Sequence, residues 1–238
     1  YLAARLFPIP LAIALGWLLV RTPPPLLIRR FAFLLVALTV AAVVFAPLGV
    51  YFLSNPDAFV TRISQVAAPS WAEALRGIGL CLRALVLPGR GDPYVRFNLP
   101  GLPVMDLAST FLALIGLVAL LVKKPATNLD GAGRLLVIAA IFVMLLPSAL
   151  ATGEITPSNL RLIGLFPFLS VLPAWGLLAL AESLPKRSLR SIVWLGLLIV
   201  AGARTAWLYA GWAGGERLFR AADGAMVVTG RARAGLLI

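Results

Sequence analysis

The chain contains no histidine and only one cysteine, Cys81, among its 238 residues. Histidine and cysteine supply most ligands of zinc and similar metal sites, so a His/Cys metal site is excluded within the chain. A single cysteine also excludes an internal disulfide. We interpret Cys81 as a small buried apolar residue, and we expect neither a metal nor another cofactor.

Acidic residues are scarce as well. The chain has 9 Asp and Glu against 21 Lys and Arg, which gives a net charge of +12. The basic residues are spread over loops and the ends of apolar stretches instead of forming one patch, and no RNA-binding or DNA-binding module is visible. We therefore expect no nucleic acid partner, and we expect anionic membrane lipids or a phosphorylated lipid instead.

Hydrophobic residues are abundant and make up 61% of the chain. A soluble domain of this composition would have too little polar surface to cover its core. Six apolar stretches approach or exceed the about 20 residues that a helix needs to cross a bilayer. We predict an all-α fold, a polytopic transmembrane bundle of about six spans, with the spans at residues 6–20, 31–53, 104–122, 135–151, 160–181 and 191–210.

The orientation follows from basic residues in short loops. Loops 21–30, 123–134 and the turn near Pro185 are rich in lysine and arginine, so the positive-inside rule places them in the cytoplasm. Within the first of them, Pro23, Pro24 and Pro25 are expected to exclude helix. The domain organisation that follows is a transmembrane domain at residues 1–210 with an external loop at 54–103, a second external loop at 152–159, and an external tail at 211–238.

Residues 71–87 of the long external segment form an amphipathic pattern. Glu73, Arg76 and Arg83 share one stripe at helical spacing, and apolar residues cover the remainder. This pattern favours a helix that lies in the membrane interface. The alternative is a seventh span, in which Arg76 and Arg83 would be costly.

Residues 88–103 form a loop whose glycines and prolines fix a specific path. The loop holds Asp92, Tyr94, Arg96 and Asn98 at the membrane surface, where they would present hydrogen-bonding groups to a sugar or phosphate. The alternative is a structural turn, in which Asp92 caps the chain and Arg96 reaches lipid headgroups. The sequence leaves both interpretations open.

Several short motifs follow one another in a set order relative to the predicted spans. They are the segment from Tyr51 to Arg62 with Asn55-Pro56, Gly91-Asp92 followed by Arg96, Asn98-Leu-Pro-Gly and Pro103, and Pro157-Ser-Asn-Leu-Arg161 continuing to Pro167. Their order resembles the later half of membrane glycosyltransferases of the GT-C type. It looks most like the prokaryotic relatives of dolichyl-phosphate-mannose protein mannosyltransferases and the aminoarabinose lipid A transferases. Tyr209 and Trp212 also resemble an aromatic pair of this family.

The resemblance implies transfer of a sugar from a polyprenyl-phosphate donor to a hydroxyl of a protein, lipid or glycan. It implies an enzyme of the prokaryotic plasma membrane that acts at the external face. In this family the catalytic carboxylate lies in the first external loop, upstream of this chain, so we expect a fragment whose catalytic residue is unknown. Asn55-Pro56 stands where the familiar relatives have His-Pro, and asparagine forms hydrogen bonds but does not titrate near neutral pH.

Arginine is the residue best suited to hold the donor phosphate, because its planar guanidinium is always charged and binds oxygens in pairs. We predict this role for Arg62, Arg96 and Arg161. For Arg161, an interfacial anchor paired with Glu154 is an equal alternative. The rest of the predicted donor-binding set is Asn55, Asp92, Tyr94, Asn98 and Glu154. Asp106 is expected to cap the helix of the third span.

A different class of function is also compatible with the sequence. The chain would then be a membrane transporter, or a non-catalytic subunit that binds lipid-linked sugars. The predicted spans contain almost no ionisable residues, whereas ion-coupled carriers place such residues near the middle of the bilayer. This difference favours the glycosyltransferase.

Overall fold

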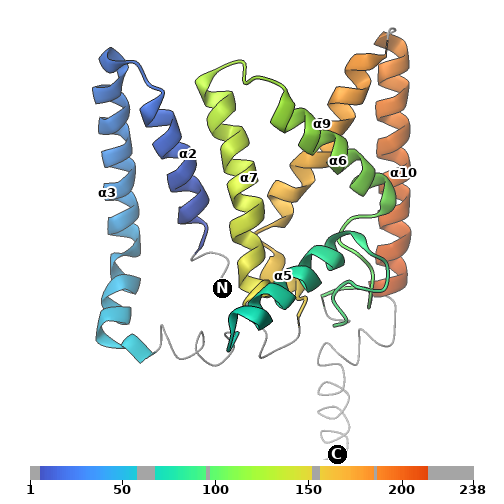
Figure 1. Ribbon diagram of the computed structural model, residues 1–238, viewed down its shortest axis with the longest axis horizontal. Coiled ribbons are helices and arrows are strands. Elements are labelled where there is room, and N and C mark those ends of the chain that lie inside the picture. Colours follow the sequence, from blue (N-terminus) through green and yellow to red (C-terminus); the bar gives the residue numbers. More distant parts are fainter. Residues whose placement is uncertain (1–5, 58–67, 95–96, 152–155, 185–186, 214–238) are drawn as a thin grey trace, which may run out of the picture. The chain divides into compact units, whose positions relative to one another are not determined.

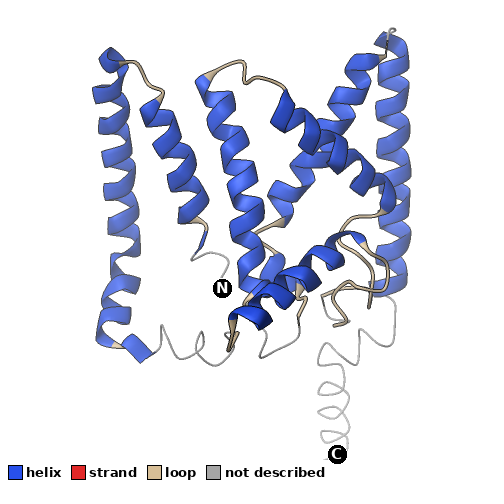
Figure 2. Cartoon of the chain, viewed as in Figure 1, coloured by secondary structure: helices blue, strands red, loops and turns tan. Residues whose placement is uncertain are grey.

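A computed structural model describes residues 6–57, 68–94, 97–151, 156–184 and 187–213. All regular structure in these ranges is helical (Figures 1 and 2), which confirms the all-α prediction. The helices are α2 (Pro8–Val20), α3 (Pro24–Ser54), α5 (Trp71–Val86), α6 (Leu107–Val122), α7 (Asn128–Ala149), α8 (Asn159–Leu162), α9 (Phe166–Ser183) and α10 (Arg187–Ala213).

Four of these helices are long and apolar enough to cross a membrane: α3, α7, α9 and α10. The helix α3 has no buried residue along its 31 positions, and of its apolar side chains all but the partly exposed Leu34 and Phe52 are exposed. Exposed apolar surface of this extent is typical of a helix that faces lipid. The helices α2 and α6 are also apolar but shorter, with 13 and 16 residues, so the predicted count of about six spans stays a prediction.

Two predicted loops are shorter than expected. The helix α3 begins at Pro24, so Pro24 and Pro25 lie in its first turn, and the expectation that they exclude helix is wrong. The N–H groups of a first turn have no acceptor within the helix, and proline therefore fits there without loss of a hydrogen bond. Arg29 and Arg30 belong to this helix, and Arg134 similarly lies inside α7.

The predicted span at residues 160–181 is interrupted. It consists of the short helix α8, a turn, and α9. In the turn the N–H of Leu165 bonds the carbonyl oxygen of Leu162 at 2.8 Å. Pro167 follows in the first turn of α9, where its missing N–H makes a new helix start favourable and a continuous helix unfavourable.

The chain divides into two compact units, and each is described by itself. The first comprises residues 1–81, 120–156 and 161–171. In it α2 packs closely on α7, because a Cβ at Gly131 would lie 2.3 Å from the Trp17 ring. The side-chain amide of Asn128 bonds the Arg21 carbonyl oxygen at 2.9 Å. The end of α2 and the start of α7 thus lie together, as expected for two loops on one side of a membrane.

The other end of α7 meets the segment that precedes α5. The N–H of Ala68 bonds the carbonyl oxygen of Leu150 at 2.7 Å. Ala68 belongs to the predicted external loop 54–103, and Leu150 lies just before the predicted external loop 152–159. Their contact is compatible with both loops lying on one side of the membrane. Nearby Cys81 is fully buried. Burial raises the pKa of its thiol, so the side chain is neutral and fits our interpretation of a small apolar residue.

The second unit comprises residues 82–119, 157–160 and 172–238. In it α6 and α9 cross in direct backbone contact at Gly116 and Gly176. A Cβ at Gly116 would lie 1.9 Å from the carbonyl oxygen of Leu172, and one at Gly176 would lie 1.9 Å from that of Leu112. Small residues permit this approach, as is common between membrane helices. The crossing fixes two walls of the site described below.

The helix α5 is amphipathic, as predicted. Arg76 and Arg83 are exposed on it, whereas Ala84 and Leu85 are buried. Its last turn is joined to the chain that enters α6, because the N–H of Met105 bonds the Leu85 carbonyl oxygen at 2.8 Å. This bond satisfies a carbonyl that has no partner inside the helix. The helix is not among the four that are long and apolar enough to span a membrane.

Candidate functional site

The loop that follows α5 is built around the carboxylate of Asp92. This side chain is 1% exposed. One of its oxygens accepts the N–H of Tyr94 at 2.7 Å, and the other accepts the N–H of Asn159 at 2.6 Å. The carboxylate therefore ties the loop to the start of α8. We assign Asp92 to loop geometry, in line with the structural-turn interpretation, since it has no surface for a ligand.

Asn98 closes the same loop from within. Its side-chain N–H groups donate to the carbonyl oxygens of Asp92 and Leu102, at 3.0 and 2.8 Å. Gly91 is required at this closure because a Cβ there would lie 1.8 Å from the Leu102 carbonyl oxygen. Gly101 has a φ of +77°, a conformation that favours glycine. The described residues of the loop thus follow a path fixed by hydrogen bonds and close backbone contacts, as its glycines and prolines predicted.

Asp106 lies at the start of α6 and makes two different interactions. One carboxylate oxygen accepts the N–H of Ser109 at 2.7 Å, which confirms the expected cap. The other oxygen pairs with a terminal nitrogen of Arg204 from α10. Burial raises the pKa of Asp106, but the hydrogen bonds from Ser109 and the charge of Arg204 outweigh burial and lower it overall. Asp106 is therefore ionised at neutral pH.

Arg204 uses only part of its bonding capacity. A guanidinium carries five N–H donors, and among the described residues its only partner is one oxygen of Asp106. The side chain is 45% exposed, against 26% for Asp106. Donors therefore remain for another acceptor, such as a phosphate or carboxylate.

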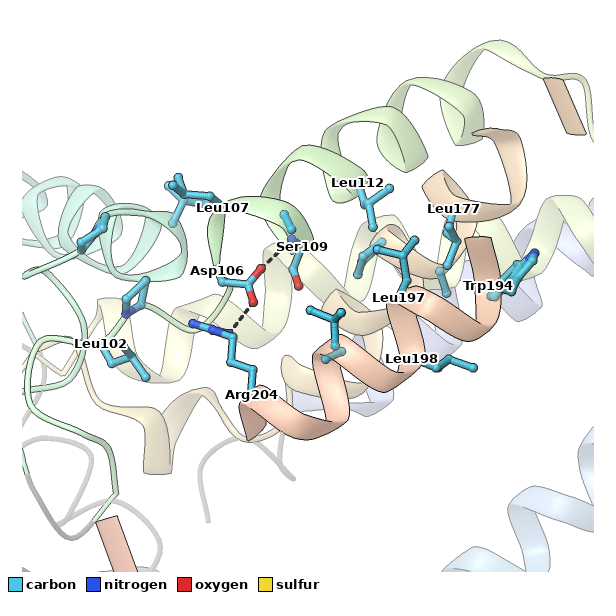
Figure 3. A pocket seen from close by; sticks show the side chains of 18 residues that line it. Leu102, Asp106, Leu107, Ser109, Leu112, Leu177, Trp194, Leu197, Leu198 and Arg204 are labelled. Carbon is cyan, nitrogen blue, oxygen red and sulfur yellow. Dashed lines mark hydrogen bonds and ion pairs between the residues drawn. The ribbon is translucent and has the colours of Figure 1, made fainter. Parts of the chain in front are cut away.

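An apolar cavity of about 670 Å³ opens beside this ion pair, between α6, α9 and α10 (Figure 3). Its walls are almost entirely apolar, and Asp106, Ser109 and Arg204 are the polar residues along one part of it (Figure 3). Trp194 lies ten residues before Arg204 on α10, which corresponds to about 15 Å of helix. The other labelled wall residues are Leu102, Leu107, Leu112, Leu177, Leu197 and Leu198.

A second hollow, of about 300 Å³, lies on the loop side of the same pair. Its lining includes Asn98, Tyr209 and Trp212, and it shares Asp106 and Arg204 with the apolar cavity. The rings of Tyr209 and Trp212 lie 5.8 Å apart between centroids. The ion pair thus stands between an apolar hollow and one lined by aromatic rings and an amide. This order suits an amphiphilic molecule with a charge between its two parts.

The remaining predicted site residues have separate surroundings. Asn55 ends α3, since its backbone and side-chain N–H groups both donate to the Tyr51 carbonyl oxygen, at 2.9 and 3.0 Å. Tyr94 is 40% exposed, with its ring 5.5 Å from that of Phe97. Arg161 is half-buried and donates to the carbonyl oxygen of Ala151 at 3.4 Å.

Of the three arginines in the predicted cluster, only Arg161 lies among the described residues. Arg62, Arg96 and Glu154 lie outside the described residues. Their convergence with Arg161 on one phosphate therefore stays a prediction, as does the pairing of Arg161 with Glu154. Of the predicted set, the structure brings Asp92, Tyr94 and Asn98 together in one loop.

Sequence reasoning missed Arg204, and it assigned Asp106 only a capping role. The two residues are 98 positions apart, so no local pattern joins them. One signal was present: Arg204 lies inside an apolar stretch predicted to span the membrane, and an ionisable residue in such a stretch is a functional candidate by default.

Comparison with known proteins identifies no relative of this chain. No family model matches it, and neither a curated protein nor a solved structure matches it. Among the described residues, no three acidic or cysteine side chains gather where they would hold a metal ion. The resemblance to GT-C glycosyltransferases accordingly stays a prediction from the motifs.

Proposed function

We propose that this chain is part of a membrane glycosyltransferase that moves a sugar from a polyprenyl-phosphate donor to a hydroxyl of a protein, lipid or glycan. One observation carries the proposal beyond the motifs. The Asp106–Arg204 pair separates an apolar cavity from a hollow lined by Asn98, Tyr209 and Trp212. A polyprenyl-linked sugar has the same order of parts: an apolar chain, a phosphate and a sugar.

The chemistry of each hollow supports this assignment. Aromatic rings offer flat apolar faces with polar edges, against which a sugar ring packs. The side-chain oxygen of Asn98 has no hydrogen-bond partner among the described residues, since both side-chain bonds of Asn98 use its N–H groups. An amide oxygen of this kind accepts a hydrogen bond from a sugar hydroxyl. Tyr209 and Trp212 near the end of α10 also fit the aromatic belt of a membrane interface.

The proposed reaction breaks the bond between the sugar carbon and the carrier phosphate, while the acceptor hydroxyl forms a new bond to that carbon. The acceptor proton passes to a carboxylate, and negative charge develops on the leaving phosphate. Fixed cations near the phosphate lower the barrier because they stabilise that charge. Arg62, Arg96 and Arg161 are the cations that the motifs propose for this step, in addition to Arg204 beside the two hollows. The carboxylate belongs to the upstream loop that the family resemblance implies.

The proposal includes a membrane arrangement. We place the protein in a prokaryotic plasma membrane with α2 and α6 as further spans, six in all, and with α5 at the external interface. The 16 residues of α6 rise about 24 Å, slightly less than the about 30 Å of the hydrocarbon core. Asp106 then lies at the external end of this span, before its first helical residue Leu107.

Sugar transfer in membranes tests this function. Membranes are prepared from cells that express the full reading frame containing this chain. A radiolabelled polyprenyl-phosphate-linked sugar and candidate acceptors are then added. We expect label to move to an acceptor, and we expect Arg62→Ala and Arg161→Ala each to reduce transfer about 100-fold. Arg29→Ala is the matched control, because the Arg29 guanidinium lies over the Phe33 ring on α3.

Two outcomes would count against the proposal. Absence of transfer from every polyprenyl-phosphate-linked sugar supplied, with the protein present and folded in the membrane, would overturn the function. Unaltered transfer in both arginine variants would reject their assigned role and leave the function to other residues.

A further inference from the structure

We propose that Arg204 binds the phosphate monoester of the polyprenyl carrier, the form that remains after the sugar has left, and that Asp106 competes with this phosphate for the guanidinium. The identity of the lipid rests on the proposed function. The binding itself is measured without any sugar transfer, so the two ideas fail separately.

The position of Arg204 supplies the first argument. Among the described residues, Arg204 is the only cation that lines either the apolar cavity or the second hollow. A lipid phosphate whose chain enters the apolar cavity would meet this guanidinium, which lines both hollows. The volume of about 670 Å³ lies within the ~300–1,000 Å³ typical of ligand sites. It accommodates the first isoprene units, while the rest of the chain extends into the bilayer.

The charge of the ligand supplies the second argument. Asp106 offers Arg204 one negative charge, and one of its oxygens is already engaged by Ser109. A phosphate monoester carries a charge of about −1.5 to −2 at neutral pH and three acceptor oxygens. The diester of a membrane phospholipid carries only one charge. The monoester is therefore the stronger competitor for the guanidinium, and this difference favours the carrier over the surrounding lipid.

The geometry of Asp106 allows Arg204 to exchange the carboxylate for a phosphate at little cost in free energy. Its bond to the N–H of Ser109 uses one oxygen, and its bond to Arg204 uses the other. Arg204 can therefore turn to a phosphate while Asp106 continues to cap α6. Only one charged hydrogen bond is exchanged for another.

Direct lipid binding tests the proposal. Purified protein in nanodiscs of neutral lipid would be titrated with polyprenyl phosphate, with polyprenol, which lacks the phosphate, and with phosphatidylglycerol, a two-chain diester. Tryptophan fluorescence reports occupancy, and Trp194→Phe identifies the signal from the apolar cavity. We expect polyprenyl phosphate to bind at least about tenfold more tightly than either comparator.

Two variants with opposite expected effects make the test specific. Arg204→Ala should weaken polyprenyl phosphate binding at least about tenfold. Asp106→Asn should tighten it, because the competing charge is removed while an amide oxygen still caps α6. Arg190→Ala is the matched control on the same helix, since Arg190 donates to the Leu184 carbonyl oxygen at 2.9 Å and lines neither hollow.

The inference is overturned if Asp106→Asn weakens binding as much as Arg204→Ala does, since the pair would then be purely structural. It is also overturned if phosphatidylglycerol binds as tightly as polyprenyl phosphate, because the site would then take any headgroup. Sugar transfer with unchanged carrier affinity in Arg204→Ala would reject the inference and leave the proposed function standing. If the lipids bind in the predicted order but no sugar is transferred, the inference is supported and the proposed function is rejected.

Discussion

Two arginine–aspartate pairs in this molecule use the same groups in different ways. Arg134 and Asp130 lie four residues apart on α7, and the guanidinium meets both carboxylate oxygens, at 3.1 and 2.9 Å. It also donates to the carbonyl oxygens of Leu120 and Lys123. Arg204 and Asp106 come from distant parts of the chain, and among the described residues Arg204 makes one hydrogen bond, to Asp106.

The difference shows which arginine has capacity for a ligand. The Arg134 side chain is 12% exposed and its donors are engaged by the protein, whereas Arg204 is 45% exposed and borders two hollows. A guanidinium whose donors are all engaged stabilises the fold and offers nothing further. One with open donors at the edge of a cavity can bind an anion. Charge alone does not distinguish the two cases.

The largest expected effect on stability comes from removal of the saturated arginine. Arg134→Ala leaves Asp130 and two carbonyl oxygens without their donor, so we expect the unfolding midpoint to fall by about 5 °C or more. The measurement is tryptophan fluorescence during heating in detergent. The unfolding midpoint of Arg134→Lys should lie between those of the unaltered protein and Arg134→Ala, because an ammonium group cannot reproduce the planar fork of the guanidinium. An unchanged midpoint in Arg134→Ala would remove the distinction between the pairs.

A smaller effect is expected at Asp106, where the cap and the ion pair can be separated. Asp106→Ala removes both, and loss of the cap alone costs about 1 kcal/mol. Asp106→Asn keeps an oxygen that accepts the Ser109 N–H, so most of the stability should remain. Comparison of the two midpoints measures the cap. If both variants lose equally, the ion pair carries the stabilisation and Arg204 is less available than we infer.

The smallest effect is expected at Arg204. At neutral pH, Arg204→Ala should cost no more than about 1 kcal/mol, because solvent screens a pair this exposed. The pKa of Asp106 is lowered in the folded protein. The ion pair therefore adds its full stability at pH values above the ordinary aspartate pKa of about 3.9. It loses this stability as the pH falls through the pKa of Asp106 in the folded protein. The unfolding midpoints of the unaltered protein and of Arg204→Ala, measured from pH 7 to pH 3, should therefore converge at pH 3. A constant difference would contradict this origin.

Much of the secondary structure was predictable because it depends on local sequence. The apolar stretches became helices, and the spacing of charges on residues 71–87 correctly predicted an amphipathic helix at Trp71–Val86. Helix ends were less predictable. Pro24 and Pro25 were read as helix breakers, although the first turn of a helix accepts them. The span at residues 160–181 was predicted as one stretch from its hydrophobicity, and Pro167 was the local signal of the break between α8 and α9.

The site was predictable only in part. The glycines and prolines of the loop predicted a fixed path, and Asp106 was correctly expected to cap α6. The sequence left two interpretations of Asp92 open, and the burial of its carboxylate in backbone hydrogen bonds decides between them. Arg204 could not be connected to Asp106, because their contact depends on how α10 packs beside α6.

The sequence by itself determined that the chain is helical and rich in apolar surface, because helix periodicity and hydrophobicity are properties of neighbouring residues. It also determined where charge is scarce, and hence where each charge matters. Only the tertiary structure decided which charges meet, which carboxylate is buried and where a cavity remains. These features arise from contacts between residues far apart in the chain, such as the glycine crossing of α6 and α9, and no local pattern encodes them.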